Sequence, residues 1–318
     1  MRLLITGGAG FIGSNLVRYL LSKESSPSII NLDLLTYAGS LENLEGLLSN
    51  PKHTFIQGDI ACQEVLNSLF GRLKPELVIN LAAETHVDRS IEDPAPMVRS
   101  NIRGTQLLLE MSKKYRIQKF LQVSTDEVYG SLKPEEEPWD EESPLKPRNP
   151  YSASKAAADL MVMAYHQTYR LPVLISRCGN NYGPRQHPEK LVPKMITCAL
   201  SGKGLPLYGD GQNIREWIHV RDHCRALELI LKEGKPGRVY NIGSGEEKTN
   251  LEIVQGILSR LSLDKDLIEY IEDRPGHDRR YALDTHRINR LGWQPQLPFN
   301  QGLDETVDWY KSKHQKEG

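Results

Sequence analysis

Three glycines at a fixed spacing place the strongest constraint on how this chain can fold. Gly7 and Gly10 lie between an apolar segment, residues 3–6, and an amphipathic one, residues 11–21, and Gly13 lies near the start of the latter. Glycines so spaced let a strand turn tightly into a helix and let an anion approach the free N–H groups at the helix N-terminus. Asp33 ends the next apolar segment, about 20 residues further on, where a carboxylate binds an unphosphorylated ribose. The pattern predicts a dinucleotide site, and Asp33 favours NAD over NADP.

A regular alternation of segments extends this turn into a fold. Short apolar segments at residues 3–6, 29–32, 54–57, 77–81, 120–124 and 172–176 alternate with helical patterns at residues 11–21, 97–115 and 151–169. Such an alternation is typical of βαβ units. We therefore expect an α/β fold with a Rossmann-type doubly wound parallel sheet of at least six strands.

The sequence pattern changes after Arg177, where proline and glycine residues separate shorter segments. We expect an NAD-binding Rossmann domain over residues 1–176, completed by a strand near residues 239–242. A smaller C-terminal domain, mainly for substrate binding, is expected over residues 177–318. The acidic, proline-rich residues 133–150 predict a mobile loop, although a charge run of this kind is also common on ordinary solvated surfaces.

Composition excludes several classes of function. The 40 basic side chains balance 41 acidic ones, so no net field favours nucleic acid or an anionic membrane as a partner. No apolar segment approaches the roughly 20 residues that span a bilayer, and the first residues reach the glycines too soon for a signal peptide, so a cytoplasmic location is expected. The four cysteines are scattered without paired spacing, and we expect neither disulfides nor a metal site.

Tyr151 and Lys155 form the first candidate reactive pair. They lie four residues apart at the start of the helical pattern that follows Pro150, and so share one helix face. A phenol with a pKa near 10 is a poor base at neutral pH, and a nearby ammonium together with an oxidised nicotinamide ring would lower that pKa. The pair therefore predicts a phenolate that takes a proton from a hydroxyl while hydride leaves the same carbon.

Thr125, Asp126 and Glu127 follow directly after the apolar segment at residues 120–124. The carboxyl ends of parallel strands form the edge where open α/β sheets bind ligands. Two adjacent carboxylates beside a hydroxyl at this edge indicate an acid/base pair. The alternative interpretation is an acidic turn that caps a helix. Asp59, which follows the apolar segment at residues 54–57, also has two interpretations. It could face an adenine amino group, or it could only stabilise a turn.

Taken together, these motifs resemble, essentially from end to end, those of the dTDP-glucose 4,6-dehydratase family of extended short-chain dehydrogenases/reductases. Besides the glycines and the Tyr151/Lys155 pair, the resemblance is carried by LTYAG at 35–39, AAETHVDRS at 82–90, STDEVYG at 124–130, NNYGP at 180–184, PEKL at 188–191 and DRPGHD at 273–278. Thr85 stands where serine is expected, which keeps the hydroxyl. After Arg260 the match is confined to DRPGHD and to LGW at 291–293.

The resemblance implies an NAD-dependent hydro-lyase that dehydrates a nucleotide-activated hexose and acts as a homodimer through helices 97–115 and 151–169. Asp126 is the implied acid, Glu127 the implied base, and Thr125 binds the hexose at O4, while Tyr151 and Lys155 serve C4 oxidation. Residues implied or expected to hold NAD are Gly7, Gly10, Phe11, Ile12, Gly13, Asp33, Thr36, Asp59, Ile60, Leu81, Ala82, Ala83, Ser100, Tyr151, Lys155 and Asn181. Residues implied to bind the nucleotide sugar are Thr85, Thr125, Asn180, Lys190, Leu191, Pro206, Tyr208, Arg215, Asn250, Arg274 and His277.

Three alternative functions stay open. Hexoses activated by UDP or CDP present the same diphosphate as dTDP-glucose, and no residue pattern reads the base by itself. A nucleotide-sugar C4 epimerase shares the cofactor end and the Tyr/Lys pair but has no need of an acid at Asp126. A non-catalytic NAD-binding sensor needs only the cofactor end, so intact Thr125, Tyr151 and Lys155 disfavour it.

Overall fold

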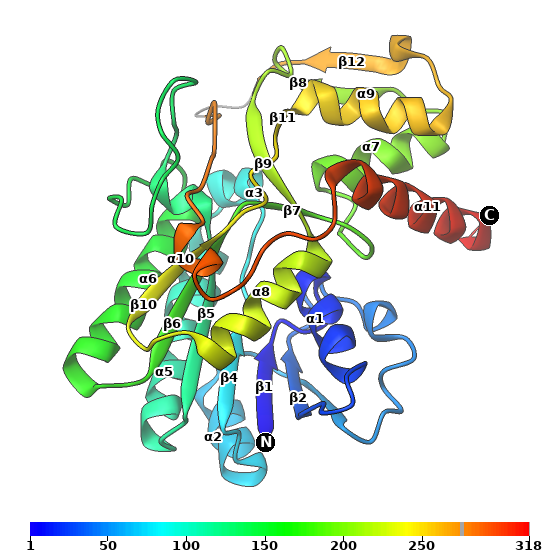
Figure 1. Cartoon of the computed structure of the whole chain (residues 1–318). Coiled ribbons are helices and arrows are strands. Elements are labelled where there is room, and N and C mark those ends of the chain that lie inside the picture. The colour runs from blue at the N-terminus through cyan, green and yellow to red at the C-terminus, as the bar shows by residue number, and fades with distance from the viewer. Residues whose placement is uncertain (274–276, 318) are drawn as a thin grey trace.

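A seven-stranded parallel sheet forms the centre of the molecule. The computed structural model describes residues 1–273 and 277–317, and within it the strand order is β10-β6-β5-β4-β1-β2-β3 (Figure 1). The strands are β1 Arg2–Thr6, β2 Ser28–Asp33, β3 His53–Gln57, β4 Leu77–Asn80, β5 Lys119–Thr125, β6 Val173–Cys178 and β10 Arg238–Ile242. The predicted α/β class and parallel sheet are confirmed, and β10 is the late strand expected near residues 239–242.

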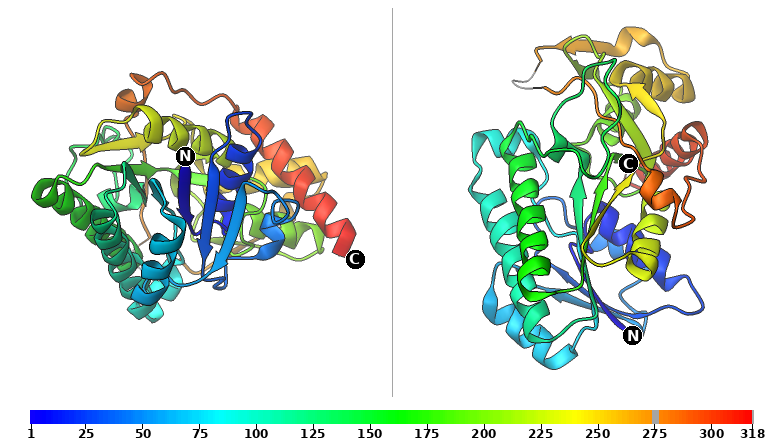
Figure 2. Two further views of the ribbon diagram at one scale, coloured as in Figure 1. Left: turned by 90° about the horizontal axis from the view of Figure 1, so that it is seen from below. Right: turned by 60° about the vertical axis from the view of Figure 1, so that its left-hand side comes forward.

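Helices cover both faces of this sheet, which explains why its strands are apolar almost without interruption. On β1, Leu3 and Ile5 point to the face covered by α1 (Phe11–Leu21) and α8 (Val220–Glu233). Leu4 points to the opposite face, covered by α2 (Gln63–Leu73), α5 (Thr105–Lys114) and α6 (Pro150–Tyr169). Figure 2 shows these two layers from further sides. The sheet is therefore sandwiched, and ligands can reach it only at its edges.

The helix expected over residues 97–115 is made of three pieces. It begins as α4 (Ala95–Met97), widens into a π-helical segment, Val98–Gly104, and continues as α5. Within the π segment, buried Asn101 accepts a hydrogen bond from Glu84 N at 2.9 Å and donates to Ser154 Oγ at 2.8 Å. Single π turns often occur at functional sites. Here the wider turn joins the loop after β4 to the helix that carries Tyr151 and Lys155.

A smaller part lies beyond the carboxyl ends of the central strands, in the upper right of Figure 1. It contains a mixed three-stranded sheet in the order β11-β9-β7 and a separate parallel pair, β12-β8. Its strands are β7 Asn180–Tyr182, β8 Leu205–Tyr208, β9 Ile214–His219, β11 Glu247–Thr249 and β12 Ile268–Ile271, and its helices are α7 Leu191–Leu200, α9 Asn250–Leu261 and α11 Phe299–Glu317. These elements share a hydrophobic core of their own.

Short helical elements complete the chain: the 3-10 turns Leu41–Leu44, Asp126–Tyr129 and Lys265–Leu267, with α3 Val87–Glu92 and α10 His286–Asn289. Among the described residues, no helix is long and apolar enough to cross a membrane.

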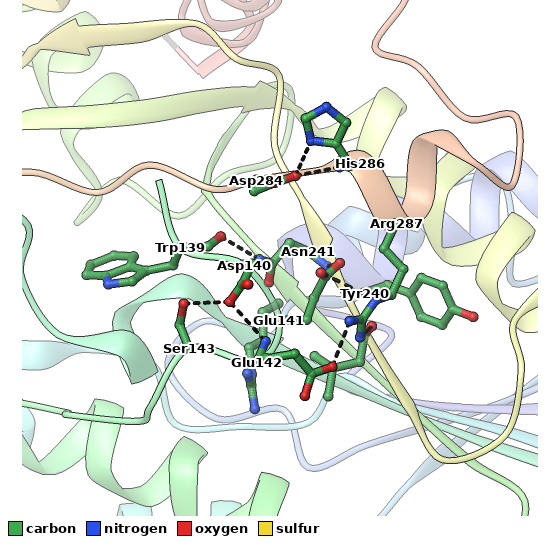
Figure 3. A network of polar contacts seen from close by, with 12 residues as sticks. Trp139, Asp140, Glu141, Glu142, Ser143, Tyr240, Asn241, Asp284, His286 and Arg287 are labelled. Carbon is green, nitrogen blue, oxygen red and sulfur yellow. Dashed lines mark hydrogen bonds and ion pairs between the residues drawn. The ribbon is translucent and has the colours of Figure 1, made fainter. Parts of the chain in front are cut away.

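The segment at residues 133–150, expected as a mobile loop, is instead fastened at several points. Trp139 N donates to Ala282 O at 3.0 Å, and Asn241 Nδ2 donates to Trp139 O at 2.9 Å. Arg287 pairs with Glu142 at 2.7 Å, and Glu141 accepts from Asn241 N at 3.0 Å, as Figure 3 shows. Two of the acidic side chains that predict mobility, Glu141 and Glu142, therefore help to anchor the segment.

Candidate active site

A pocket opens at the carboxyl edge of the central sheet, where β1 lies between β2 and β4 and the connections diverge in opposite directions. This switch point is where doubly wound sheets bind dinucleotides. All the residues expected to hold the cofactor line the pocket: Gly7, Gly10, Phe11, Ile12, Gly13, Asp33, Thr36, Asp59, Ile60, Leu81, Ala82, Ala83, Ser100, Tyr151, Lys155 and Asn181. The structure thus brings together segments that are far apart in the sequence.

The glycine turn between β1 and α1 has no room for side chains. Gly7 has φ +71°, and a Cβ added at Gly13 would lie 2.1 Å from Gly7 O. Helix α1 begins at Phe11 after Gly10, which makes no side-chain cap. Its first N–H groups therefore face the pocket, and the cradle fits a pyrophosphate against a helix N-terminus.

Asp33 is held in the pocket wall by backbone donors. Its Oδ2 accepts from Ala9 N at 2.9 Å and its Oδ1 accepts from Leu35 N at 2.8 Å. Burial raises the pKa of Asp33 above its ordinary value, and these hydrogen bonds oppose the rise. Asp59 also lines the pocket, but one oxygen accepts from Ala61 N at 2.7 Å and the other pairs with Arg99 at 2.5 Å. For Asp59 both interpretations from the sequence therefore stay open.

At the opposite end of the pocket, helix α6 presents Tyr151 and Lys155. The helix starts with a capping box between Asn149 and Ser152, with Pro150 in the first turn. Tyr151 and Lys155 are both buried, and Lys155 Nζ donates to Val123 O at 2.7 Å. Two neighbouring helix turns thus deliver a phenol and an ammonium to the end of β5.

In the protein without cofactor, the pKa of Tyr151 is set by burial and by the charges around it. Burial raises it well above 10, and the carboxylates of Glu127 and Asp126 raise it further, while a hydrogen bond with Thr125 acts in the opposite direction. The expected lowering by Lys155 together with an oxidised nicotinamide ring concerns the complex with NAD, and it stays a prediction. Burial also lowers the pKa of Lys155. Ionisation of this phenol needs a further positive charge in the pocket.

Thr125, Asp126 and Glu127 lie where β5 ends and a 3-10 turn begins. Thr125 caps that turn, since its Oγ1 accepts from Glu127 N at 3.2 Å and donates to Asp126 Oδ1 at 3.1 Å. Asp126 Oδ2 is buried and has no hydrogen-bond partner among the residues that the structure describes. Burial and the neighbouring Glu127 raise the pKa of Asp126 well above its ordinary value. Asp126 is therefore suited to carry a proton, and the acidic turn is also a capping turn.

The residues implied to bind a nucleotide sugar fall into two groups. Thr85, Thr125, Asn180 and Lys190 line the pocket, where Lys190 Nζ donates to Thr85 O at 2.9 Å. The others that the structure describes lie outside this lining, on the smaller part and the segment after it: Leu191, Pro206, Tyr208, Arg215, Asn250 and His277. Arg274 lies outside the described residues.

Two contacts organise that second group. Buried Arg215 donates to Asp278 O at 2.8 Å and lies over the ring of Tyr281 at 4.2 Å. The rings of Tyr208 and His277 meet edge to face, with centroids 6.3 Å apart. The cation and the aromatic residues therefore gather on the side of the smaller part, with their positions held by backbone and ring contacts.

Several lining residues escape the sequence reasoning: Cys178, Gln186, His187 and Glu189. Cys178 looks like a scattered cysteine in the sequence, yet it ends β6 beside the reactive helix, and burial raises the pKa of its thiol to about 12. Its position at the carboxyl end of an expected strand is the sequence feature that indicates a place in the site. Glu189 stands within the PEKL motif and contacts Lys190 at 3.6 Å and His86 at 3.5 Å.

Comparisons with known proteins agree with this architecture along the whole chain. A family model described as GDP-mannose 4,6 dehydratase matches residues 4–306. The chain is 53% identical over 310 residues to the low-salt glycan biosynthesis protein Agl12 of Haloferax volcanii, with 98% of each chain covered. It is 49% identical to the dTDP-glucose 4,6-dehydratase of Neisseria gonorrhoeae, with 97% of this chain and 95% of that one covered.

A solved structure extends the likeness to three dimensions. The crystal structure of DesIV, a dTDP-glucose 4,6-dehydratase from Streptomyces venezuelae with NAD and TYD bound, matches with a TM-score of 0.95 at 47% identity. The match covers 99% of this chain and 98% of that one. Both the central sheet and the smaller part therefore have counterparts in that protein.

Proposed function

The chain belongs to the dTDP-glucose 4,6-dehydratase family of extended short-chain dehydrogenases/reductases, and we propose that it converts dTDP-glucose to dTDP-4-keto-6-deoxyglucose. The observation that carries the proposal is Asp126. A buried carboxyl with a raised pKa, next to a second carboxylate and in the same pocket as Tyr151 and Lys155, supplies an acid for a leaving hydroxyl. An enzyme that only oxidises and re-reduces C4 has no use for such an acid.

NAD is the cofactor that the pocket fits. Relatives of the same fold carry it in their crystal structures, and here the glycine cradle suits its pyrophosphate while Asp33 suits an unphosphorylated ribose. Bound NAD would accept a hydride from C4 of the hexose and return it to C6, so that none is consumed overall. In this proposal residues 1–176 hold the cofactor and residues 177–318 mainly hold the nucleotide sugar.

Tyr151 takes the proton from the C4 hydroxyl in the first step. The pKa of this phenol is raised in the protein alone, and an oxidised nicotinamide ring would add positive charge to that of the Lys155 ammonium, which favours ionisation. Thr125, which hydrogen-bonds both Tyr151 and Asp126, positions the hexose at O4. Oxidation is thereby confined to the complex in which both ligands are in place.

The second step is loss of water between C5 and C6. A ketone at C4 acidifies the C5 proton, because the carbanion left behind is an enolate. Glu127 takes that proton, and protonated Asp126 gives its own proton to the C6 hydroxyl as the C–O bond breaks. The pair thus ends with the proton on Glu127 and the charge on Asp126, and one water is released.

The diphosphate of the substrate needs fixed cations, and Lys190 and Arg215 are the residues proposed for this role. The choice of dTDP over UDP or CDP rests on the relatives that act on dTDP-glucose. The decisive experiment incubates the protein with dTDP-, UDP- and CDP-glucose and follows the alkali-induced absorbance of a 4-keto sugar. Turnover of dTDP-glucose at the highest kcat/KM supports the proposal, whereas dTDP-galactose as the only product refutes the dehydratase function.

A homodimer and a cytoplasmic location complete the proposal. Exposed apolar side chains, Ile91, Val98 and Leu160, lie on α3, the π segment and α6, which contact one another on the outer face of the sheet. An apolar face of this kind suits a second copy of the chain. Light scattering that gives the mass of a monomer would refute the dimer.

A further inference from the structure

A buried chain of polar contacts joins the two segments that carry the proposed chemistry. Asp159 lies one helical turn after Lys155 on α6, and its Oδ2 accepts from Arg177 Nε on β6 at 2.9 Å. Arg177 donates a second time, from its terminal nitrogen to Tyr129 Oη at 2.9 Å. Tyr129 ends the 3-10 turn that starts with Asp126. One ion pair therefore connects the helix of Tyr151 to the turn of Asp126.

Stability alone is a weak reason for this pair to exist. Asp159 is 1% exposed and Arg177 is 5% exposed, so both charges are removed from water. The desolvation of a buried pair commonly offsets its attraction, and apolar residues of similar volume often serve as well. The buried carboxylate of Asp159 therefore suggests a function for its negative charge.

The Lys155 ammonium is the neighbour that such a charge would serve. Lys155 is 4% exposed, and burial lowers its pKa, while the carboxylate of Asp159 raises it. The other ionisable groups around it are the Cys178 thiol on β6, Tyr151 on its own helix, and Asp126 and Glu127 on the 3-10 turn. From the π segment the nearby side chain is Asn101, which is uncharged. Asp159, one helical turn away on α6, is thus a buried carboxylate whose charge favours the protonated form of Lys155.

We propose that Asp159 is a positioning residue for C4 oxidation: fixed by Arg177, its carboxylate keeps the buried Lys155 ammonium charged so that Tyr151 can ionise. The inference rests on the proposed roles of Tyr151 and Lys155. Arg177 supports this role, because burial raises the pKa of Asp159 and the guanidinium lowers it, which keeps the carboxylate charged. The pair therefore sets the pH above which the lysine loses its proton and oxidation stops.

The test measures C4 oxidation alone, as formation of bound NADH from a dTDP-6-deoxyglucose analogue, which has no leaving group at C6. In Asp159→Asn the alkaline limb of the pH profile is expected to move down by about one pH unit, or roughly tenfold in the proton concentration at its midpoint. In Arg177→Gln it should also move down, because the carboxylate loses the partner that holds it, and the double variant should move no further than Asp159→Asn. Asp159→Glu should restore most of the wild-type profile.

A matched control separates charge from structure. Tyr129→Phe removes the hydroxyl that bonds to Arg177 and Asn241. It leaves the charges of Asp159 and Arg177 in place. It should reduce stability without moving the pH profile. Equal profiles for Asp159→Asn and wild type overturn the inference.

Direct titration of isotope-labelled Lys155 by NMR gives a second readout that needs no turnover. If Asp159→Asn fails to fold, the same titration in Arg177→Gln and in Tyr129→Phe decides, since only the former should lower the pKa of Lys155. Wild-type protein that oxidises no sugar would refute the proposed function, while an unchanged lysine titration would refute the role of Asp159.

Discussion

The two ends of the pocket are built by different means. At the cofactor end the fit comes from missing side chains: at Gly13 even one added carbon would lie 2.1 Å from a backbone oxygen. At the reacting end the fit comes from buried ionisable groups, with the pKa of Asp126 and of Tyr151 raised and that of Lys155 lowered by burial. Substitutions at the first end should therefore act through shape and binding, and those at the second through proton transfer with binding preserved.

Tyr151→Phe should give the largest effect and leave the cofactor end intact. Loss of the phenol removes the base for the C4 hydroxyl, so C4 oxidation is expected to slow about 1000-fold while NAD affinity stays unchanged. Single-turnover NADH formation and NAD titration by calorimetry measure the two quantities. Tyr165→Phe, on the same helix but bonded to Glu110, is the matched control and should retain full activity. Near-normal oxidation by Tyr151→Phe would remove the phenol from the mechanism.

Asp126→Asn should separate the two reaction steps, C4 oxidation and loss of water. The amide keeps the shape of the side chain but carries no acidic proton, so loss of water is expected to slow about 100-fold. C4 oxidation does not need that proton and should persist, with bound NADH accumulating during turnover. Rapid-quench analysis of the sugar, alongside NADH absorbance, resolves the steps. Comparable slowing of both would contradict the assignment of Asp126 as the acid.

Gly13→Ala should act at the opposite end by shape. The added methyl group meets Gly7 O and Gly8 Cα, which are backbone atoms and cannot move aside as a flexible side chain can. Overpacking of this kind costs about 2 kcal/mol, which corresponds to roughly 30-fold weaker NAD binding if the cradle absorbs the strain. With NAD at saturation, the pH profile should match that of wild type.

Gly71→Ala is the control for that substitution. This glycine lies inside helix α2, where the new carbon would lie at an ordinary contact distance, 3.5 Å, from Tyr115 Oη. Stability should be equal or greater, because alanine favours a helix over glycine. A changed pH profile in saturated Gly13→Ala would break the distinction between the two ends.

The same difference explains how far the sequence could predict this molecule. The glycine turn, the central strands and the pocket lining follow from local spacing and alternation, since these report backbone geometry directly. The rise in the pKa of Tyr151 does not follow from local spacing, because the burial of this side chain arises from packing between β5, β6 and α6. The anchoring of residues 133–150 likewise depends on partners such as Ala282 and Arg287, more than a hundred residues away.

The smallest effect on activity is expected where the two ends meet, at Asn181, because the group that titrates there acts on stability. His223 donates from Nδ1 to Asn181 Oδ1 at 2.9 Å, which leaves its buried Nε2 without a proton, and burial lowers the pKa of His223 to about 3. A histidine in the unfolded chain has a pKa near 6.5. Between that pH and about 3, this histidine therefore binds a proton in the unfolded chain but not in the folded one. Stability should therefore fall as the pH drops below about 6.5, by up to about 1.4 kcal/mol per pH unit.

Chemical denaturation at a series of pH values measures that slope, and two variants locate its source. His223→Gln keeps a side-chain donor for Asn181 but cannot titrate, so its stability should depend less steeply on pH than that of wild type. His314→Gln replaces an exposed histidine on α11 and should leave the slope unchanged. If both variants keep the wild-type slope, the buried neutral imidazole contributes nothing to it. Asn181 would then be held by hydrogen bonding alone, and the junction would behave like the cofactor end, through shape rather than protonation.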